Sequence, residues 1–312
     1  MGKIKKIIYS VILLMATSLL SSLSLNEKLV DNLYSHVSFL VSGEGPRNNN
    51  NTESLNSVSE YIKQEFIKSG YSAEFQEYEA GGKLFRNVIC SYGNQDLPVI
   101  VLGAHYDVFG NFPGADDNAS GIAGLIEIAR ITAENKPELN YRIEFTAYST
   151  EEPPFFGTVN MGSAVHAGNL FKNNAKVKLA IVLEMIGYFS ENENSQQYPA
   201  GIMKLFYPNK GNFIAVVGRP ADKKYINSVK KTLKQKSTLS VKTLSAPSFV
   251  KGIDFSDHRN YWKYGYNAIM ITDTAFFRNP NYHKKTDTID TLDFNRMAEV
   301  VKGVYFSLLE IK

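Results

Sequence analysis

The fold is decided by the stretch Pro98-Val-Ile-Val-Leu-Gly-Ala-His-Tyr-Asp107, together with Gly114-Ala-Asp-Asp-Asn-Ala-Ser-Gly121 a few residues later. The run before His105 has no polar interruption, which is typical of a strand covered on both faces of a sheet. Beyond Gly121, apolar residues recur at helical spacing, so a helix is expected over residues 119–133. A buried strand that leads into a helix is the repeating unit of α/β folds.

Further periodic segments extend this pattern along the chain. Apolar runs predict buried strands at Tyr141–Ser149, Val177–Leu183 and Ala268–Thr272. A strand pair is expected at residues 71–78 and 84–92, and helices at residues 52–69, 160–171 and 222–236. Residues 48–51 and 190–208 are polar and are expected to form a surface loop and a long loop near the ligand-binding edge. Strands that alternate with helices predict an α/β fold with a mostly parallel, mixed central sheet and helices on both faces.

The composition excludes several classes of protein. Lys and Arg number 34 and Asp and Glu 31, which gives a net charge of +3 and argues against nucleic acid as a partner. Cys90 is the single cysteine, so an intramolecular disulfide framework and cysteine-ligated zinc are excluded. It lies in an apolar stretch and is expected to be a buried thiol. Any metal site must therefore use His, Asp and Glu.

The first 24 residues have the pattern of a signal peptide. Lys3, Lys5 and Lys6 precede an apolar run, and small residues follow at a position suited to cleavage before Leu25. An uncleaved membrane anchor is the alternative, although the run is short for a membrane span. We expect a secreted or periplasmic protein whose residues 25–312 form a single domain, with membrane contact only through the N-terminal segment.

Side chains that can bind metal ions follow each of the four strands that are predicted to be buried. They are His105, Asp107, Asp116 and Asp117 after the first strand, Glu151 and Glu152 after the second, Glu184 after the third, and His283 after the fourth. Ligands of open α/β sheets bind beyond the carboxyl ends of the strands. Each group has a simple alternative, such as Asp116–Asp117 capping a helix, but these alternatives require four coincidences at four strand ends.

Two histidines with several carboxylates and no cysteine form a ligand set for paired divalent metal ions, most naturally zinc. The tandem Glu151-Glu152 can supply one metal ligand and one proton acceptor, because neighbouring side chains after a strand point in different directions. Asp107 is placed to accept the second N–H of the His105 imidazole and so to orient the ring.

At these residues the sequence resembles a known family. His105-Tyr106-Asp107, the block from Gly114 to Gly121, Glu151-Glu152, Glu184 and Tyr282-His283 are similar to the motifs of exported di-zinc aminopeptidases of the leucyl aminopeptidase and aminopeptidase Y type. The resemblance covers residues 55–309 and includes the stretch Phe255-Ser256-Asp257-His258. It implies a three-layer zinc-exopeptidase fold, without an inserted protease-associated domain, that acts on peptides with a free N-terminus.

The resemblance also implies a role for each site residue. One zinc ion would be held by His105 and Glu184, the other by Glu152 and His283, with Asp117 bridging the two. Glu151 would be the general base, which takes a proton from the attacking water and later passes it to the leaving amine. Independently of the resemblance, Tyr282 lies beside His283 in the sequence, where it would donate a hydrogen bond to the oxyanion or act only as a packing aromatic. Asp257 is a candidate for the wall of the site.

The sequence departs from the family pattern at one ligand. Many relatives carry Asp where this chain has Glu184, so one of the two metal sites is expected to be weaker or to take another divalent ion. His36, His166 and His258 match no metal position and are expected to be structural or exposed.

Three other functions compete with this interpretation. A glutaminyl-peptide cyclotransferase shares the fold, but its pocket is expected to be lined by tryptophan, whereas this chain has only Trp262. Aminoacylases and carboxypeptidases carry a lid domain, for which the stretch between Glu184 and His283 leaves no room. A non-catalytic binding protein would be expected to lack one of the ligands or the base, and none is missing.

Overall fold

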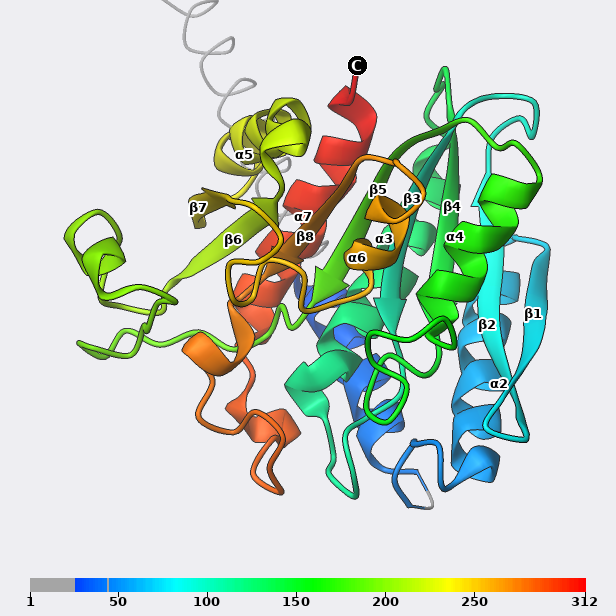
Figure 1. Cartoon of the computed structure of the whole chain (residues 1–312), viewed down its shortest axis with the longest axis horizontal. Coiled ribbons are helices and arrows are strands. Elements are labelled where there is room, and N and C mark those ends of the chain that lie inside the picture. Colours follow the sequence, from blue (N-terminus) through cyan, green and yellow to red (C-terminus); the bar gives the residue numbers. More distant parts are fainter. Residues whose placement is uncertain (1–25, 44) are drawn as a thin grey trace, which may run out of the picture.

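The computed structural model describes residues 26–43 and 45–312. Eight strands form one mixed sheet in the order β1-β2-β4-β3-β5-β8-β6-β7 (Figure 1). The strands are β1 (Ala73–Ala80), β2 (Lys83–Tyr92), β3 (Val99–His105), β4 (Arg142–Tyr148), β5 (Val177–Glu184), β6 (Phe213–Gly218), β7 (Ser240–Ser245) and β8 (Ala268–Thr272). The four central strands β4, β3, β5 and β8 are parallel, and antiparallel pairs join β2 to β4, β1 to β2 and β6 to β8.

Helices cover both faces of this sheet. Residues 26–41 form a helix that packs with α2 (Thr52–Lys68), α3 (Gly121–Asn135), α5 (Lys223–Lys236) and α7 (Phe294–Glu310) on one face. The other face carries α4 (Gly162–Lys172) and α6 (His258–Trp262), which lie in front of the sheet in Figure 1. Alternate residues of β3 serve the two layers, since Ile100 and Leu102 face the first and Val99 and Val101 the second.

The predicted α/β fold with a mostly parallel mixed sheet is confirmed, and the predicted strands and helices are found within a few residues of their expected bounds. Cys90 is buried as expected. The prediction of a surface loop at residues 48–51 is wrong for Asn48, which is only 3% exposed because its side chain bonds to another loop. The predicted signal peptide lies outside the described residues, and the domain range 25–312 stays a prediction.

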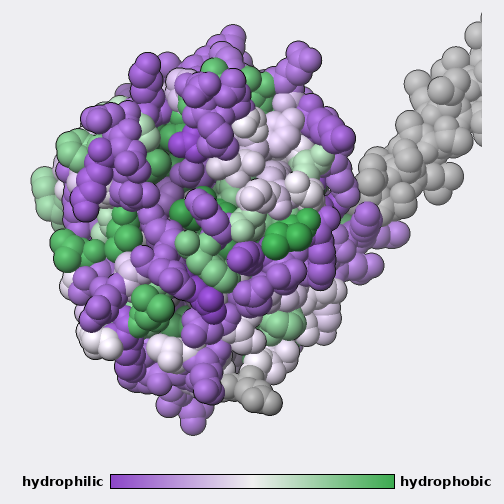
Figure 2. Space-filling view, turned by 90° about the vertical axis from the view of Figure 1, so that its right-hand side faces the viewer, coloured by the Kyte–Doolittle hydropathy of each residue, from purple (hydrophilic) through white to green (hydrophobic). Residues whose placement is uncertain are grey.

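The outer strand β1 carries a row of exposed carboxylates. Its residues Glu74, Glu77 and Glu79 place negative charges along the edge, a common protection against pairing with another chain. Figure 2 views the molecule from this side and shows a mainly hydrophilic surface on which hydrophobic residues are scattered. Among residues 26–43 and 45–312, no helix has both the length and the apolar character that a membrane span requires.

Candidate metal centre

The predicted ligands meet at the carboxyl end of the parallel strands. His105 and Glu184 are the last residues of β3 and β5, and Glu152 follows shortly after β4. Asp117 lies on the helical turn Ala115–Ser120 that precedes α3, and His283 lies in the loop after β8. Parallel strands bring their carboxyl ends to one edge, which is why residues so far apart in the sequence come together.

Asp117 joins two groups of possible ligands. Its Oδ1 lies 3.4 Å from His105 Nε2, and its Oδ2 lies 3.1 Å from His283 Nε2. On the first side, His105 Nε2 is also 3.4 Å from Glu184 Oε2. On the second side, His283 Nε2 is 3.2 Å from Glu152 Oε1. Each group of three offers ligand atoms that lie within 4.8 Å of one another, so each could close around a single metal ion.

The Asp107 carboxylate is not the nearest acceptor to the His105 imidazole, contrary to the prediction. The nearest acceptor to His105 Nδ1 is the backbone carbonyl of Asp107, at 3.1 Å, whereas the Asp107 carboxylate is 3.5 Å away. That carboxylate instead accepts hydrogen bonds from the backbone N–H groups of Glu151 and Glu152, both at 3.0 Å. Asp107 therefore holds the tandem glutamates as well as the first histidine.

The carboxylate of Asp287 holds the turn that presents Asp117. Asp287 accepts hydrogen bonds from the backbone N–H groups of Asp116 and Asp117, at 3.0 and 3.1 Å. Gly114, which opens the turn, has a φ of +61°, a conformation that favours glycine. The peptide bond between Asp117 and Asn118 is cis.

Neither carboxylate of the Asp116–Asp117 pair serves as a helix cap. Asp116 accepts hydrogen bonds from the Gly187 N–H at 3.0 Å and from Asn279 Nδ2 at 2.7 Å. The side chain of Asn118 accepts from the Gly121 N–H at the start of α3. The alternative that Asp116–Asp117 only cap the helix is therefore wrong.

Glu151 is the free carboxylate of the site. It is 6% exposed, and no described residue donates a hydrogen bond to its side chain. Burial raises its pKa well above the usual value, against the influence of His105, and the nearby Glu152 and Glu184 raise it further. Burial and the charge of Asp117 likewise raise the pKa of Glu152 to about 7. A carboxylate with a raised pKa is a better proton acceptor at neutral pH.

Nearby carboxylates raise the pKa values of both histidines in the metal-free protein. Burial alone would lower the pKa of His283, but its hydrogen bonds to Asp117 and Glu152 raise it to about 10. The pKa of His105 is raised in the same way, mainly by Glu184 and Glu151 and against the effect of burial. The same contacts hold the pKa of Asp117 well below its usual value, although burial opposes this. Such strongly perturbed groups in one place are typical of functional sites.

Aromatic rings fix the second histidine. The His283 imidazole stacks on Phe109, with ring centroids 4.2 Å apart and planes 9° from parallel. The ring of Tyr282 also stacks on the His283 imidazole, with ring centroids 3.8 Å apart and planes 16° from parallel. No described residue forms a hydrogen bond with the Tyr282 hydroxyl, so its predicted role as an oxyanion donor stays a prediction.

A second layer of polar residues surrounds Glu184. Ser256 Oγ donates to Glu184 Oε2 at 2.6 Å, and the neighbouring Asp257 is fully buried, with Ser163 as its donor. Burial raises the pKa of Asp257 to about 7.

The three remaining histidines lie outside both ligand groups and bond elsewhere: His36 to Tyr61, His166 to Tyr261 and Glu144, and His258 to the Ile253 carbonyl.

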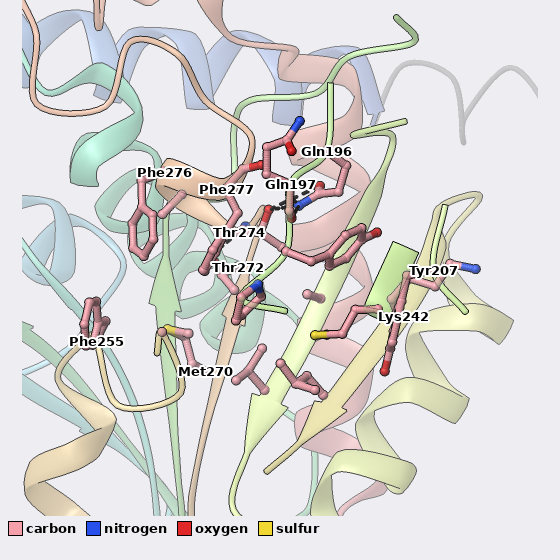
Figure 3. Close-up of a pocket in the computed structure, with 18 of the residues that line it drawn as sticks. Gln196, Gln197, Tyr207, Lys242, Phe255, Met270, Thr272, Thr274, Phe276 and Phe277 are labelled. Carbon is pink, nitrogen blue, oxygen red and sulfur yellow. Dashed lines mark hydrogen bonds between the residues drawn. The ribbon is translucent and has the colours of Figure 1, made fainter. Parts of the chain in front are cut away.

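An apolar pocket opens beside the centre and includes Glu184 in its wall. Its floor is formed by β6 and β8, and Figure 3 shows Phe255 and Phe276 on one side and Tyr207 and Lys242 on the other. The loop at residues 190–208 supplies Gln196 to Pro199, Met203 and Tyr207. The loop expected near the ligand-binding edge therefore lines this pocket, together with Phe276 and Phe277.

Three further residues support the centre without a clear signal in the sequence. Asp287 holds the turn of Asp117, and Arg47 and Asn48 hold the loop after β3. Asp287 follows His283 by a few residues, which is a weak signal for a polar residue near the site. Arg47 has no such signal, because its partners are backbone carbonyls that only the fold brings near.

A family model and several known proteins match most of this chain. The model of "Peptidase family M28" matches residues 87–306. "Uncharacterized protein YfbL" of Escherichia coli strain K12 is 45% identical over 284 residues, which are 88% of this chain and 86% of that protein. "Leucine aminopeptidase 1" of Emericella nidulans is 27% identical over 250 residues, which are 74% of this chain but only 56% of that protein. The chain thus spans little more than half of the length of this named aminopeptidase.

Solved structures show the same fold. LapB from Legionella pneumophila has a TM-score of 0.72 at 24% identity, covering 92% of this chain and 73% of its own. Glutaminyl cyclase from Bacteroides thetaiotaomicron has a TM-score of 0.68 at 20% identity, covering 91% of this chain and 98% of its own. At such low identity these similarities establish the fold alone.

Proposed function

Because the chain belongs to peptidase family M28, we propose that it is a metal-dependent aminopeptidase that releases the N-terminal amino acid from peptides. The observation that carries this proposal is the shared Asp117, whose two carboxylate oxygens face the two histidines of separate ligand groups. A bridging carboxylate between two such groups is what a pair of closely spaced divalent ions requires.

The donor set fits zinc. Imidazole nitrogens and carboxylate oxygens are common zinc ligands, and His105, Glu184, Asp117, Glu152 and His283 supply only these atoms. Bound zinc would supply Lewis acidity, which polarises a peptide carbonyl and makes water more acidic. With Glu184 in place of the Asp found in many relatives, we propose that the group of His105 and Glu184 binds its ion more weakly or accepts another divalent ion.

Glu151 carries the proton in this proposal. Its unoccupied carboxylate takes the proton from the attacking water as the new C–O bond forms. When the C–N bond breaks, Glu151 gives the same proton to the leaving amine, so the residue ends as it began. Asp107 supports this role because it binds the backbone N–H groups of both Glu151 and Glu152.

The surroundings of the centre favour a free N-terminal amine and an apolar first side chain. Several carboxylates close to one another attract a positively charged amino group. The pocket beside Glu184 is lined by apolar surfaces of Phe213, Met270 and Phe276, which suits leucyl or aromatic residues better than charged ones.

A cyclase is the competing activity, since one neighbour in fold is a glutaminyl cyclase. The position of the single tryptophan argues against it. Trp262, the last residue of α6, is 9% exposed and donates its indole N–H to the carbonyl of Ala268 at the start of β8. It therefore joins α6 to β8 and does not line the pocket. The residue before His283 is Tyr282, so this position beside the centre does not supply a tryptophan either.

Hydrolysis of leucine p-nitroanilide and of its Nα-acetylated form tests the proposal. We expect the mature chain to cut only the free-amine substrate, to lose activity with a chelator and to regain it with zinc. A metal-loaded protein that cuts neither anilide but cyclises glutaminyl peptides would be a cyclotransferase. Equal turnover of leucyl and of charged anilides would contradict the proposed pocket preference.

We further propose that residues 1–24 are a signal peptide and that residues 25–312 act as a single domain outside the cytoplasm, secreted or in the periplasm. N-terminal sequencing of protein recovered outside the cytoplasm is expected to begin at Leu25. Recovery of the full chain from membranes would instead indicate an uncleaved anchor.

A further inference from the structure

Arg47 is a buried cation in a segment that precedes the part of the chain matched by the family model, residues 87–306. It is 2% exposed, and its guanidinium donates hydrogen bonds to four backbone carbonyls. Nε donates to Tyr106 O at 2.9 Å, Nη1 to Leu40 O at 3.1 Å and to Pro113 O at 2.6 Å, and Nη2 to Gly114 O at 2.5 Å. One side chain thus ties the end of the N-terminal helix to both ends of the loop at residues 106–114.

That loop supplies several parts of the metal centre. It carries Asp107, which binds the amides of Glu151 and Glu152, and Phe109, which stacks on His283. At Gly114 it leads directly into the turn that presents Asp117. The Val108 N–H donates to the Arg47 carbonyl at 3.0 Å, so the backbone of Arg47 contacts the same loop as its side chain.

The charge of Arg47 also faces the carboxylates of the centre. None of the described carboxylates forms an ion pair with it, yet it lies close enough to Asp287, Asp117, Asp107 and Glu152 for their charges to act on it. Burial lowers the pKa of Arg47 to about 10 and these carboxylates oppose that shift, so the group stays charged at neutral pH. A buried positive charge partly offsets the mutual repulsion of the carboxylates.

We propose that Arg47 is a positioning residue of the metal centre, which holds Asp107 and Asp117 in place for metal binding through its contacts with residues 106–114. This inference rests on the proposed metal centre and not on the identity of the substrate. Residues behind the ligands typically change metal affinity by about 10–100-fold when they are removed. A purely structural arginine would lower the stability of the fold and leave the metal affinity unchanged.

Arg47→Gln and Arg47→Lys separate these possibilities. Gln removes the charge and most of the hydrogen bonds, while Lys keeps the charge but cannot reach four carbonyls at once. Arg142→Gln is the matched control, because Arg142 is a partly buried arginine at the start of β4, at the opposite end of the sheet, paired with Glu144. For each protein, zinc affinity is measured by competition with a chromophoric chelator, together with the visible spectrum of the Co(II) form and the melting temperature of the metal-free form.

We expect Arg47→Gln to weaken zinc binding by about 10–100-fold and to change the Co(II) spectrum, and Arg47→Lys to recover part of the affinity. Arg142→Gln should match the wild type in both. Wild-type affinity and spectrum in Arg47→Gln, with only a lowered melting temperature, would overturn the inference. If Arg47→Gln does not fold, unchanged zinc affinity in Arg47→Lys overturns it and a clear loss supports it. Wild-type protein that binds zinc but hydrolyses no anilide contradicts the proposed activity alone, whereas wild-type protein that binds no zinc contradicts the centre itself.

Discussion

Glu151 and Glu152 are neighbours in the chain, but the structure gives their side chains different surroundings. Glu152 faces His283, while the carboxylate of Glu151 has no hydrogen-bond donor among the described residues. This difference follows from the opposite directions of adjacent side chains after β4, with both backbone N–H groups held by Asp107. One of the pair is therefore free to accept a proton.

Replacing Glu151 by Gln should separate metal binding from catalysis. The amide cannot take a proton, so the rate of anilide hydrolysis is expected to fall by about 10²–10⁴-fold while the zinc content stays the same. Metal analysis and steady-state kinetics measure the two effects. Glu60→Gln, at an exposed glutamate on α2 that belongs to neither ligand group, is the control and should keep full activity. Loss of zinc in Glu151→Gln would instead make Glu151 a ligand.

At the scale of single residues, the sequence predicted the types and order of the side chains that meet at the centre. It could not show that Asp107 binds two amides, or that Arg47 and Asp287 hold the turn of Asp117. These contacts join a side chain to the backbone of a distant segment. A backbone N–H or C=O is present at nearly every residue, so no residue pattern marks such partners.

Glu127 on α3 connects this helix to the N-terminal helix at residues 26–41. It is fully buried and accepts hydrogen bonds from Asn32 Nδ2 at 3.1 Å and from Arg130 at 2.8 Å, with His36 Nε2 at 3.4 Å. Although burial acts to raise its pKa, the donors His36 and Arg130 lower it to about 2. Its carboxylate therefore stabilises the fold in the ionised form.

Replacing Glu127 by Gln should lower the free energy of unfolding of the chelated protein by about 3 kcal/mol at pH 7. Because the folded pKa lies below the unfolded value, the wild-type advantage is present above about pH 4.5 and is lost as the pH falls toward 2. Urea unfolding at pH 7 and pH 3 measures this difference. Glu134→Gln, which removes the exposed partner of the same Arg130, should cost about 1 kcal/mol or less. If the free energies of unfolding of the wild type and of Glu127→Gln differ by the same amount at both pH values, this role for Glu127 is contradicted.

Strand β6 forms part of the pocket floor through Ala215, which is 5% exposed. Ala215→Leu should fill space next to Met270 and lower kcat/KM for a leucyl anilide by about 10-fold or more, with a smaller effect on an alanyl anilide. Ala246→Leu, on the same side of the sheet but outside the pocket lining, is the control for overpacking. A parallel loss for both anilides in Ala215→Leu would show that the pocket does not receive the first side chain.

Elements differed in how well they could be predicted. The central strands β3, β4, β5 and β8 are buried on both faces, so their apolar runs are clear in the sequence. The edge strand β7 is mostly partly exposed, with the sequence Ser-Val-Lys-Thr-Leu-Ser, and has no such run. The N-terminal helix at residues 26–41 was not predicted either, and it owes part of its position to a buried contact with Glu127 that lies about ninety positions further along the chain.

Across the whole molecule, metal ions would link β3, β5 and the loops after β4 and β8. Zinc is therefore expected to raise the melting temperature by roughly 5–10 °C at a concentration well above its Kd, and a chelator should reverse the rise. Differential scanning calorimetry with and without the chelator measures it. Magnesium at the same concentration is the control, because the imidazole-containing ligand groups suit zinc better.

Metal uptake should also release protons. The pKa of His283 is about 10 in the metal-free protein, so the imidazole must lose its proton before its nitrogen can bind an ion. Between pH 6 and pH 8, each proton that zinc binding releases is expected to make the zinc affinity rise by about tenfold per pH unit. Chelator competition at these pH values measures the slope. A flat profile would contradict protonated histidines at the metal-free centre.

The order of strands has a consequence for the synthesis of the chain. Strand β8 is made last of the eight but lies between β5 and β6, and His283 comes later still. A nascent chain that ends before residue 268 holds two unconnected sheet fragments, β1 to β5 and β6 with β7, and only one of the two histidines. Both ligand groups can thus be completed only once nearly the whole polypeptide has left the ribosome, so the proposed activity would be absent from unfinished chains.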